Sequence, residues 1–199
     1  SLKDLSSVRD MAIYAGSPRL LPDSLQREGP LVEKLRQQRA VFTGKTHTVE
    51  FAFGGLGVNS HWGTPRNPWD AIKHRVPGGS SSGAGVSLAE GSVVIALGSD
   101  TAGSVRIPAS VTGAVGFKPS AGRWPTEGLV PLSPTFDVPG VLTRSVADAA
   151  IAITVIESGL RDAPEITVPK AIDPTDVVIG RMDAYFWQDC SPGVVEQVE

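Results

Sequence analysis

A stretch of small residues that encloses one apolar run constrains this chain more than any other feature. Residues 77–110 read PGGSSSGAGVSLAEGSVVIALGSDTAGSVRIPAS. A flexible linker would also be rich in glycine and serine, but it would not carry VVIAL, which has the density of β-branched residues found in a buried strand. We therefore expect a short helix of small residues at 83–90, a buried strand at 93–98 and a tight turn directly after that strand.

The rest of the chain alternates between helical and strand-like segments. The helix expected at 145–159 has the clearest limits, because Ser145 can cap it, Asp148 stands three residues later and Gly159 can end it. Residues 54–77 predict an ordered but irregular loop. This alternation is typical of a layered α/β fold with a largely buried sheet. Further helices are expected at 30–38 and after Ser191, and further strands at 40–44, 114–118 and 177–182.

Composition narrows the classes of protein that remain. The chain has 199 residues, of which 41% are hydrophobic and 20% are charged, and this suits one ordinary domain with a real core. A net charge of −3 without clustered Lys and Arg argues against direct nucleic-acid binding. No apolar run approaches the roughly 18 residues of a membrane span. The chain has a single cysteine, Cys190, so it can form neither an internal disulfide framework nor a multi-cysteine metal site. This cysteine usage favours a cytoplasmic protein. We expect the protein to need neither a metal nor a cofactor.

The serine cluster fits one hydrolase motif but lacks that motif's partner. Gly79 to Gly83 fits G-x-S-x-G, which in an α/β-hydrolase would make Ser81 the nucleophile and would require a later histidine. No histidine follows His74. A serine nucleophile would therefore need another base, and lysine is the obvious substitute, because a desolvated amine can lose its proton near neutral pH. Spacing alone does not choose among the six lysines, Lys3, Lys34, Lys45, Lys73, Lys118 and Lys170.

Several motifs occur together in one order, and with them the chain resembles the amidase signature family. The motifs are GKTHTVEFAFGG at 44–55, GTPRNPWD at 63–70, GGSSSGAG at 78–85, ALGSDTAGSVRIPAS at 96–110, GAVGFKPS at 113–120 and GVLTRSVADAA at 140–150. The resemblance covers residues 1 to about 190 and implies a layered α/β/α fold with a large mixed sheet. Members of the family are typically more than twice as long, and the chain has no initiator methionine. We therefore expect residues 1–199 to be part of a single domain, truncated at both ends.

The resemblance also implies a catalytic triad of two serines and one lysine. Carried over position by position, the nucleophile is Ser104 in DTAGSVR, and the relay serine is Ser80 in GGSSS, which in the family follows a cis peptide bond. The base is Lys3 in SLKD. Lys45 is a tempting alternative, but it belongs to the downstream segment that begins GKT, where His47 stands in place of the usual asparagine.

The residues around Ser104 are expected to support it. The turn before Ser104 would supply an oxyanion hole from the backbone N–H groups of Thr101, Ala102 and Gly103. Ser81 is expected to hydrogen-bond Ser80 or Lys3, and Asp100 and Arg106 are expected to hold the turn through charge-assisted bonds. The alternative for the whole segment is that glycine and serine only shape tight turns.

The function that the resemblance implies is that of an amidase. It would hydrolyse a small-molecule carboxamide to a carboxylic acid and an amine or ammonia, through an acyl-enzyme on Ser104. One alternative is the glutaminase component of a tRNA-dependent amidotransferase, its A subunit, which releases ammonia from glutamine for a partner protein. Another alternative is a noncatalytic fragment that binds a ligand or partner. Assembly into a homodimer is left open.

Overall fold

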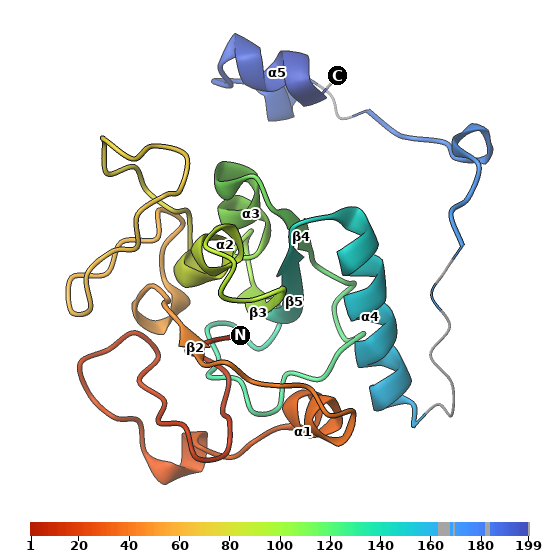
Figure 1. Cartoon of the computed structure of the whole chain (residues 1–199). Helices are drawn as coiled ribbons and strands as arrows, with labels where there is room; N and C mark the ends of the chain where they lie inside the picture. Colours follow the sequence, from red (N-terminus) through yellow and green to blue (C-terminus); the bar gives the residue numbers. More distant parts are fainter. Residues whose placement is uncertain (163–167, 169, 182–183, 199) are drawn as a thin grey trace. The chain divides into compact units, whose positions relative to one another are not determined.

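The structure is a computed structural model that describes residues 1–162, 168, 170–181 and 184–198 (Figure 1). The chain divides into two compact units, Ser1–Val168 and Pro169–Glu199. The second unit contains α5 (Pro192–Val198), which confirms the helix expected after Ser191. It also contains two short 3-10 helices, Pro174–Asp176 and Ala184–Trp187. The sheet and the candidate site lie in the first unit.

A five-stranded mixed sheet organises the first unit, in the order β2-β1-β3-β5-β4. Strand β1 is parallel to both β2 and β3, whereas β5 is antiparallel to both β3 and β4. This arrangement confirms the expected α/β class with a mixed sheet. The strands are β1 (Leu2–Lys3), β2 (Lys45–Thr46), β3 (Ile95–Asp100), β4 (Val115–Phe117) and β5 (Val138–Thr143).

Four α-helices cover the two faces of this sheet in pairs (Figure 1). Successive side chains of a strand point to opposite faces, so Leu97 of β3 packs with α1 and α4, whereas its neighbour Ala96 packs with α2 and α3. The helices are α1 (Pro30–Gln37), α2 (Ser82–Ala89), α3 (Arg106–Thr112) and α4 (Val146–Leu160), and two short 3-10 helices lie at Asp23–Leu25 and Glu50–Ala52. The first unit is therefore layered α/β/α, as the resemblance to the family implies.

The limits of α4 are partly as predicted. Ser145 caps the helix, since its Oγ accepts a hydrogen bond from the N–H of Asp148 at 3.1 Å and donates one to the Asp148 carboxylate at 2.7 Å. The prediction that Gly159 ends the helix is wrong, because α4 continues to Leu160. A Cβ at Gly159 would lie 2.8 Å from the side-chain nitrogen of Gln38. The glycine therefore allows α4 to pack closely against the end of α1.

Two of the predicted strands are wrong. Residues 40–44 form no strand. The side chain of Val41 is exposed, so pairing in the sheet would not bury it. The strand begins one residue later, at Lys45, where it pairs with β1. Residues 177–181 also form no strand, and both Val178 and Ile179 are exposed. Residue 182 of that prediction lies outside the described residues.

Local sequence patterns do not predict two elements beside the site, β5 and α3. Strand β5 reads VPGVLT, and its Pro139 and Gly140 are residues that usually interrupt strands. Helix α3 contains Pro108, which usually interrupts a helix. The other predicted elements lie within two residues of their expected limits. Among the described residues, no helix is long and apolar enough to cross a membrane.

Candidate active site

Lys3 is a fully buried lysine at the end of β1. Leu2 belongs to the core on the α1 and α4 side, so the alternation of the strand turns Lys3 toward α2. Its Nζ donates hydrogen bonds to Ser80 Oγ at 2.6 Å and to Ser99 Oγ at 3.0 Å, and it lies 3.4 Å from the carbonyl oxygen of Ser99. Its ammonium is therefore held by neutral partners rather than by a direct ion pair.

Burial controls the charge of this lysine. Removal from water disfavours the ammonium and lowers the pKa of Lys3 to about 7, although the negative charges of Asp100 and Asp137 partly oppose this effect. At neutral pH the side chain therefore divides between the ammonium and the free amine. A free amine can accept a proton from a neighbouring hydroxyl, so Lys3 has the chemistry of a general base.

Ser80 lies two residues before the start of α2 and is also fully buried. The peptide bond between Gly79 and Ser80 is cis. The carbonyl oxygen of Ser80 accepts hydrogen bonds from the N–H of Val49 and from Thr48 Oγ1, both at 3.1 Å. A Cβ at position 79 would lie 2.7 Å from the carbonyl oxygen of Gly54. Glycine at this position therefore allows the loop to bring Ser80 against Lys3.

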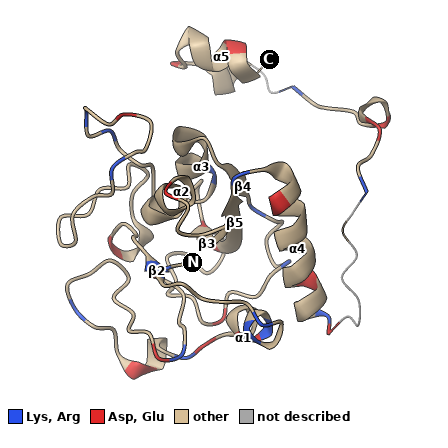
Figure 2. Ribbon diagram, in the orientation of Figure 1, with Lys and Arg blue, Asp and Glu red and all other residues tan. Residues whose placement is uncertain are grey.

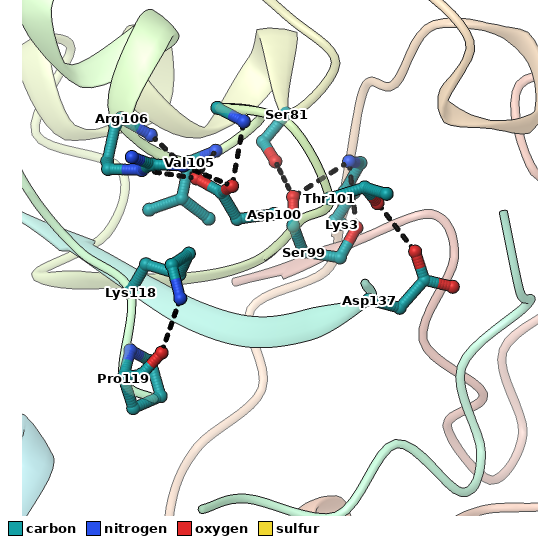
Figure 3. A network of polar contacts seen from close by, with 11 residues as sticks. Lys3, Ser81, Ser99, Asp100, Thr101, Val105, Arg106, Lys118, Pro119 and Asp137 are labelled. Carbon is teal, nitrogen blue, oxygen red and sulfur yellow. Dashed lines mark hydrogen bonds and ion pairs between the residues drawn. The ribbon is translucent and has the colours of Figure 1, made fainter. Parts of the chain in front are cut away.

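Ser81 links two parts of the site through backbone groups. Its N–H donates to the carbonyl oxygen of Ser104 at 3.2 Å, and its hydroxyl donates to the carbonyl oxygen of Ser99 at 3.4 Å. Figure 3 shows that Lys3 approaches the same residue, Ser99. Ser81 thus reaches Lys3 by way of Ser99 instead of by the direct bond that the sequence analysis expected.

Asp100 anchors the turn that carries Ser104 (Figure 3). Its buried carboxylate accepts hydrogen bonds from the N–H of Gly103 at 2.8 Å and of Val105 at 3.1 Å, and it pairs with the Arg106 guanidinium at 2.9 and 3.1 Å. Burial alone would raise the pKa of Asp100, but the bonds from Arg106, Val105 and Gly103 outweigh burial and hold the pKa below its ordinary value. The carboxylate is therefore a fixed negative centre for the turn, and Figure 2 marks the positions of the Lys, Arg, Asp and Glu residues along the ribbon.

These contacts change the expectation for the oxyanion hole. The N–H of Gly103 is directed at Asp100, so it already has an acceptor. Of the three expected donors, Thr101 and Ala102 remain as candidates. The side chain of Thr101 is itself fixed, because its hydroxyl donates to Asp137 Oδ1 at 2.5 Å.

A cavity of about 490 Å3 opens in front of the turn. Ser104, Thr101 and Ala102 form one wall, and apolar side chains such as Ile107 and Leu132 form much of the rest. The described residues that line it carry no charged side chain. The cavity therefore provides space for a small ligand beside Ser104.

Lys45, the alternative base, lies in a different environment. Its Nζ forms an ion pair with Asp4 at 3.0 Å and donates to the carbonyl oxygen of Ser6 at 2.6 Å. Both Lys45 and Asp4 line a separate cavity of about 340 Å3 beside His47. The geometry thus brings Lys3, and not Lys45, to Ser80.

Two residues of this cluster, Ser99 and Asp137, are not predicted by the sequence motifs. Ser99 is the last residue but one of β3, and its position beside Asp100 was the only local signal for it. Asp137 lies 36 positions from Thr101, so no local pattern could have paired them. Within the described part of the chain, no group of three or more His, Cys, Asp or Glu side chains is placed to hold a metal ion.

The fold and the cluster define the chain as a layered α/β protein with a buried lysine–serine pair beside a serine-bearing turn. The chain belongs to the Amidase family, whose model matches residues 1–199, and this confirms the resemblance seen in the sequence motifs.

Individual relatives fall into more than one functional group. The chain is 53% identical over 199 residues to the 2-amino-5-chloromuconic acid deaminase of Comamonas testosteroni, covering 100% of this chain and 42% of that protein. It is 40% identical over 149 residues to the indoleacetamide hydrolase of Pseudomonas savastanoi, covering 75% of this chain and 32% of that protein. A glutamyl-tRNA(Gln) amidotransferase component from Syntrophus aciditrophicus is 42% identical over 171 residues, which cover 84% of this chain and 34% of that one.

A comparison with solved structures also finds similar proteins in this family. A crystal structure of an amidase matches with a TM-score of 0.72 and 44% identity, over 78% of this chain and 35% of that one. The chain thus spans less than half the length of the proteins that it matches.

Proposed function

We propose that the protein hydrolyses the C–N bond of a small-molecule carboxamide, giving a carboxylic acid and an amine or ammonia, through an acyl-enzyme on Ser104. The observation that carries the proposal is the buried contact of 2.6 Å between Lys3 Nζ and Ser80 Oγ, together with the pKa of about 7 for Lys3. A lysine that is half deprotonated at neutral pH and bonded to a serine is suited to moving a proton.

In the proposed acylation, Ser104 Oγ attacks the amide carbonyl carbon and forms a C–O bond. The proton of Ser104 passes through Ser80 to the free amine of Lys3, and it is then delivered to the departing nitrogen as the C–N bond breaks. A water molecule attacks the acyl-enzyme by the reverse proton route and releases the acid. Ser104 and Lys3 end the cycle in their starting protonation states.

The oxyanion that develops on the carbonyl oxygen needs donors that are already in place. In the proposal, the backbone N–H groups of Thr101 and Ala102 supply them, because the N–H of Gly103 is directed at Asp100. Asp100 and Arg106 act as scaffold, since their bonds fix the turn on both sides of Ser104. Ala102 stands where the family usually has glycine, and the backbone N–H is the same in either residue.

Two other activities compete within the family. The 53% identity to a deaminase favours C–N cleavage in an amino-substituted unsaturated acid as one candidate, and the 42% identity to an amidotransferase component favours glutamine as another. The uncharged lining of the cavity at Ser104 supports an uncharged amide over a dianion. A binding role without catalysis would leave the buried Lys3–Ser80 hydrogen bond with a structural role only. A cytoplasmic location and a homodimer stay predictions.

Active-site labelling tests the proposal. The purified full-length protein is treated with a serine-directed fluorophosphonate, and the modified residue is located by mass spectrometry. We expect label on Ser104, its complete loss in Ser104→Ala, and a rate lowered by about 100-fold or more in Ser80→Ala and Lys3→Ala. Ser110→Ala removes an exposed serine of α3 and serves as the matched control with unchanged labelling. Label on another serine, or equal labelling of all variants, would exclude the proposed mechanism.

Substrate panels then separate the three activities. Release of ammonia is measured from glutamine, from uncharged arylacetamides and alkanamides, and from a 2-aminomuconic acid. The proposal predicts the highest kcat/KM for an uncharged amide. A preference for glutamine that rises when a partner protein copurifies would favour the amidotransferase instead.

A further inference from the structure

We propose that Asp137 is a positioning residue of this site, which ties the turn carrying Ser104 to the neighbouring cavity wall and places an uncompensated negative charge near Lys3. The inference rests on the proposed function. Nothing in the motif pattern around Ser80 or Ser104 assigns a role to this residue, which lies directly before β5.

The register of the sheet brings Asp137 to the turn. Strands β3 and β5 are antiparallel, and their pairing ends with Asp100 opposite Val138. One step further, Thr101 faces Asp137, and the hydroxyl of Thr101 donates to Asp137 Oδ1 at 2.5 Å. Figure 3 shows this bond on the side of Lys3 away from Arg106. Asp137 therefore fixes the first residue of the turn that leads to Ser104.

The second oxygen of the same carboxylate holds a neighbouring part of the cavity wall. Asp137 Oδ2 accepts hydrogen bonds from the N–H groups of Leu132 and Ser133, both at 2.9 Å. Leu132 and Ser133 line the same cavity as Thr101 and Ser104. One side chain thus fixes the turn relative to the adjacent segment that lines the same cavity. Loss of either bond would loosen the donors that the oxyanion needs.

The charge of Asp137 has a second consequence at Lys3. Two carboxylates act on Lys3 and favour its ammonium, Asp100 from β3 and Asp137 from the start of β5. Asp100 is paired with the Arg106 guanidinium. The hydrogen bonds to Asp137, by contrast, come from a hydroxyl and two backbone N–H groups, which carry no formal charge.

The other elements around Lys3 add little charge. On β2, the charged side chain is Lys45, which is paired with Asp4, and His47 lies directly after β2. From the α2 side, the contact is the uncharged Ser80. After the proton of Ser104 reaches Lys3, the ammonium therefore faces Asp137 as its uncompensated counter-charge.

Two substitutions separate the two roles. Asp137→Asn removes the charge, and because an amide has only one accepting oxygen it also breaks part of the network. Thr101→Val keeps the charge and removes only the bond to the turn. The rate of fluorophosphonate labelling and kcat/KM for an amide are measured from pH 5 to pH 9 in the full-length protein. Asp162→Asn, which removes an exposed carboxylate paired with Lys34, is the control.

We expect Asp137→Asn to lower the maximal rate at least tenfold and to move the midpoint of the pH profile downward by about half a pH unit or more. Thr101→Val should lower the maximal rate without moving the midpoint, and the control should change neither. An unchanged profile for Asp137→Asn would overturn the inference. The inference would also be overturned if Asp137→Asn lost rate while Thr101→Val kept its rate and the midpoint of the pH profile did not move.

Failure of the inference is distinguishable from failure of the proposed function. If the wild type is labelled on Ser104 and Asp137→Asn behaves like it, only the inference fails. If Ser104→Ala is labelled as fast as the wild type, the proposed function fails. Should Asp137→Asn not fold, Asp137→Glu retains the charge and displaces the bonds, so the midpoint should stay while the maximal rate falls. A midpoint that moves in Asp137→Glu as the rate stays constant would contradict the inference.

Discussion

The burial of Lys3 has a consequence for stability that can be measured without knowing the substrate. Its pKa falls from the ordinary 10.5 to about 7 in the folded protein because the side chain is removed from water. Between these two pH values, the unfolded chain binds a proton at Lys3 that the folded protein does not. The free energy of unfolding therefore rises with pH across this window, by about 1.4 kcal/mol for each pH unit and by about 5 kcal/mol in total.

The perturbation that isolates this effect is Lys3→Met, which keeps an unbranched side chain and removes the charge. The substitution also leaves Ser80 and Ser99 without their partner, but that cost does not depend on pH. Urea denaturation of wild type and variant is measured at pH 6.5, 7.5, 8.5 and 9.5. We expect the wild type to gain on the variant by about 3 kcal/mol or more between the first and last values.

Two outcomes would refute the reasoning. Parallel stability curves for the two proteins would mean that Lys3 keeps its proton in the folded state at every pH tested. A wild type that loses stability relative to Lys3→Met as the pH rises would mean that the folded protein holds the ammonium more tightly than the unfolded chain does.

The remaining predictions concern reactivity and packing. The rate of Ser104 labelling should fall as the pH falls through about 7, because protonated Lys3 cannot accept a proton, and a rate that is flat from pH 5 to pH 9 would contradict this role. Gly85→Ala should lower the free energy of unfolding by about 1–3 kcal/mol in urea denaturation, because the new Cβ would lie 2.9 Å from the Cβ of Thr112, whose hydroxyl is held by Pro108. Gly193→Ala, where a Cβ meets nothing within 4 Å, should not lower it, and equal losses in both variants would argue against the packing explanation.

The sequence predicted the local features of this fold well. Periodicity and caps placed α1, α2 and α4 and the region of β3, since those signals lie within each segment. The same local signals did not predict β5, because Pro139 and Gly140 usually interrupt a strand. In the fold, β5 pairs with β3 on one side and β4 on the other, and this pairing accommodates both residues. Tertiary pairing, which a single segment does not encode, decides such cases.

The residues of the candidate site were likewise predictable only in part. Family motifs placed Lys3, Ser80 and Ser104 by position, and the structure brings the first two into contact. The contacts of Ser99 and Asp137 depend on strand register and on a pairing across 36 positions, so neither a motif nor a spacing pointed to them. The engagement of the Gly103 N–H by Asp100 was equally invisible, because it depends on where a carboxylate points.

Strand β1 has only two residues, yet both of its neighbours come from much later in the chain, β2 at 45–46 and β3 at 95–100. Lys3 therefore meets Ser80 only after segments almost a hundred positions apart have closed into one sheet, and closures of that length are slow steps in folding. A partly folded chain would contain every residue of the cluster and still lack an activated serine. The reactivity proposed for Ser104 is therefore expected only in the assembled sheet, and labelling of this serine would then report completed folding.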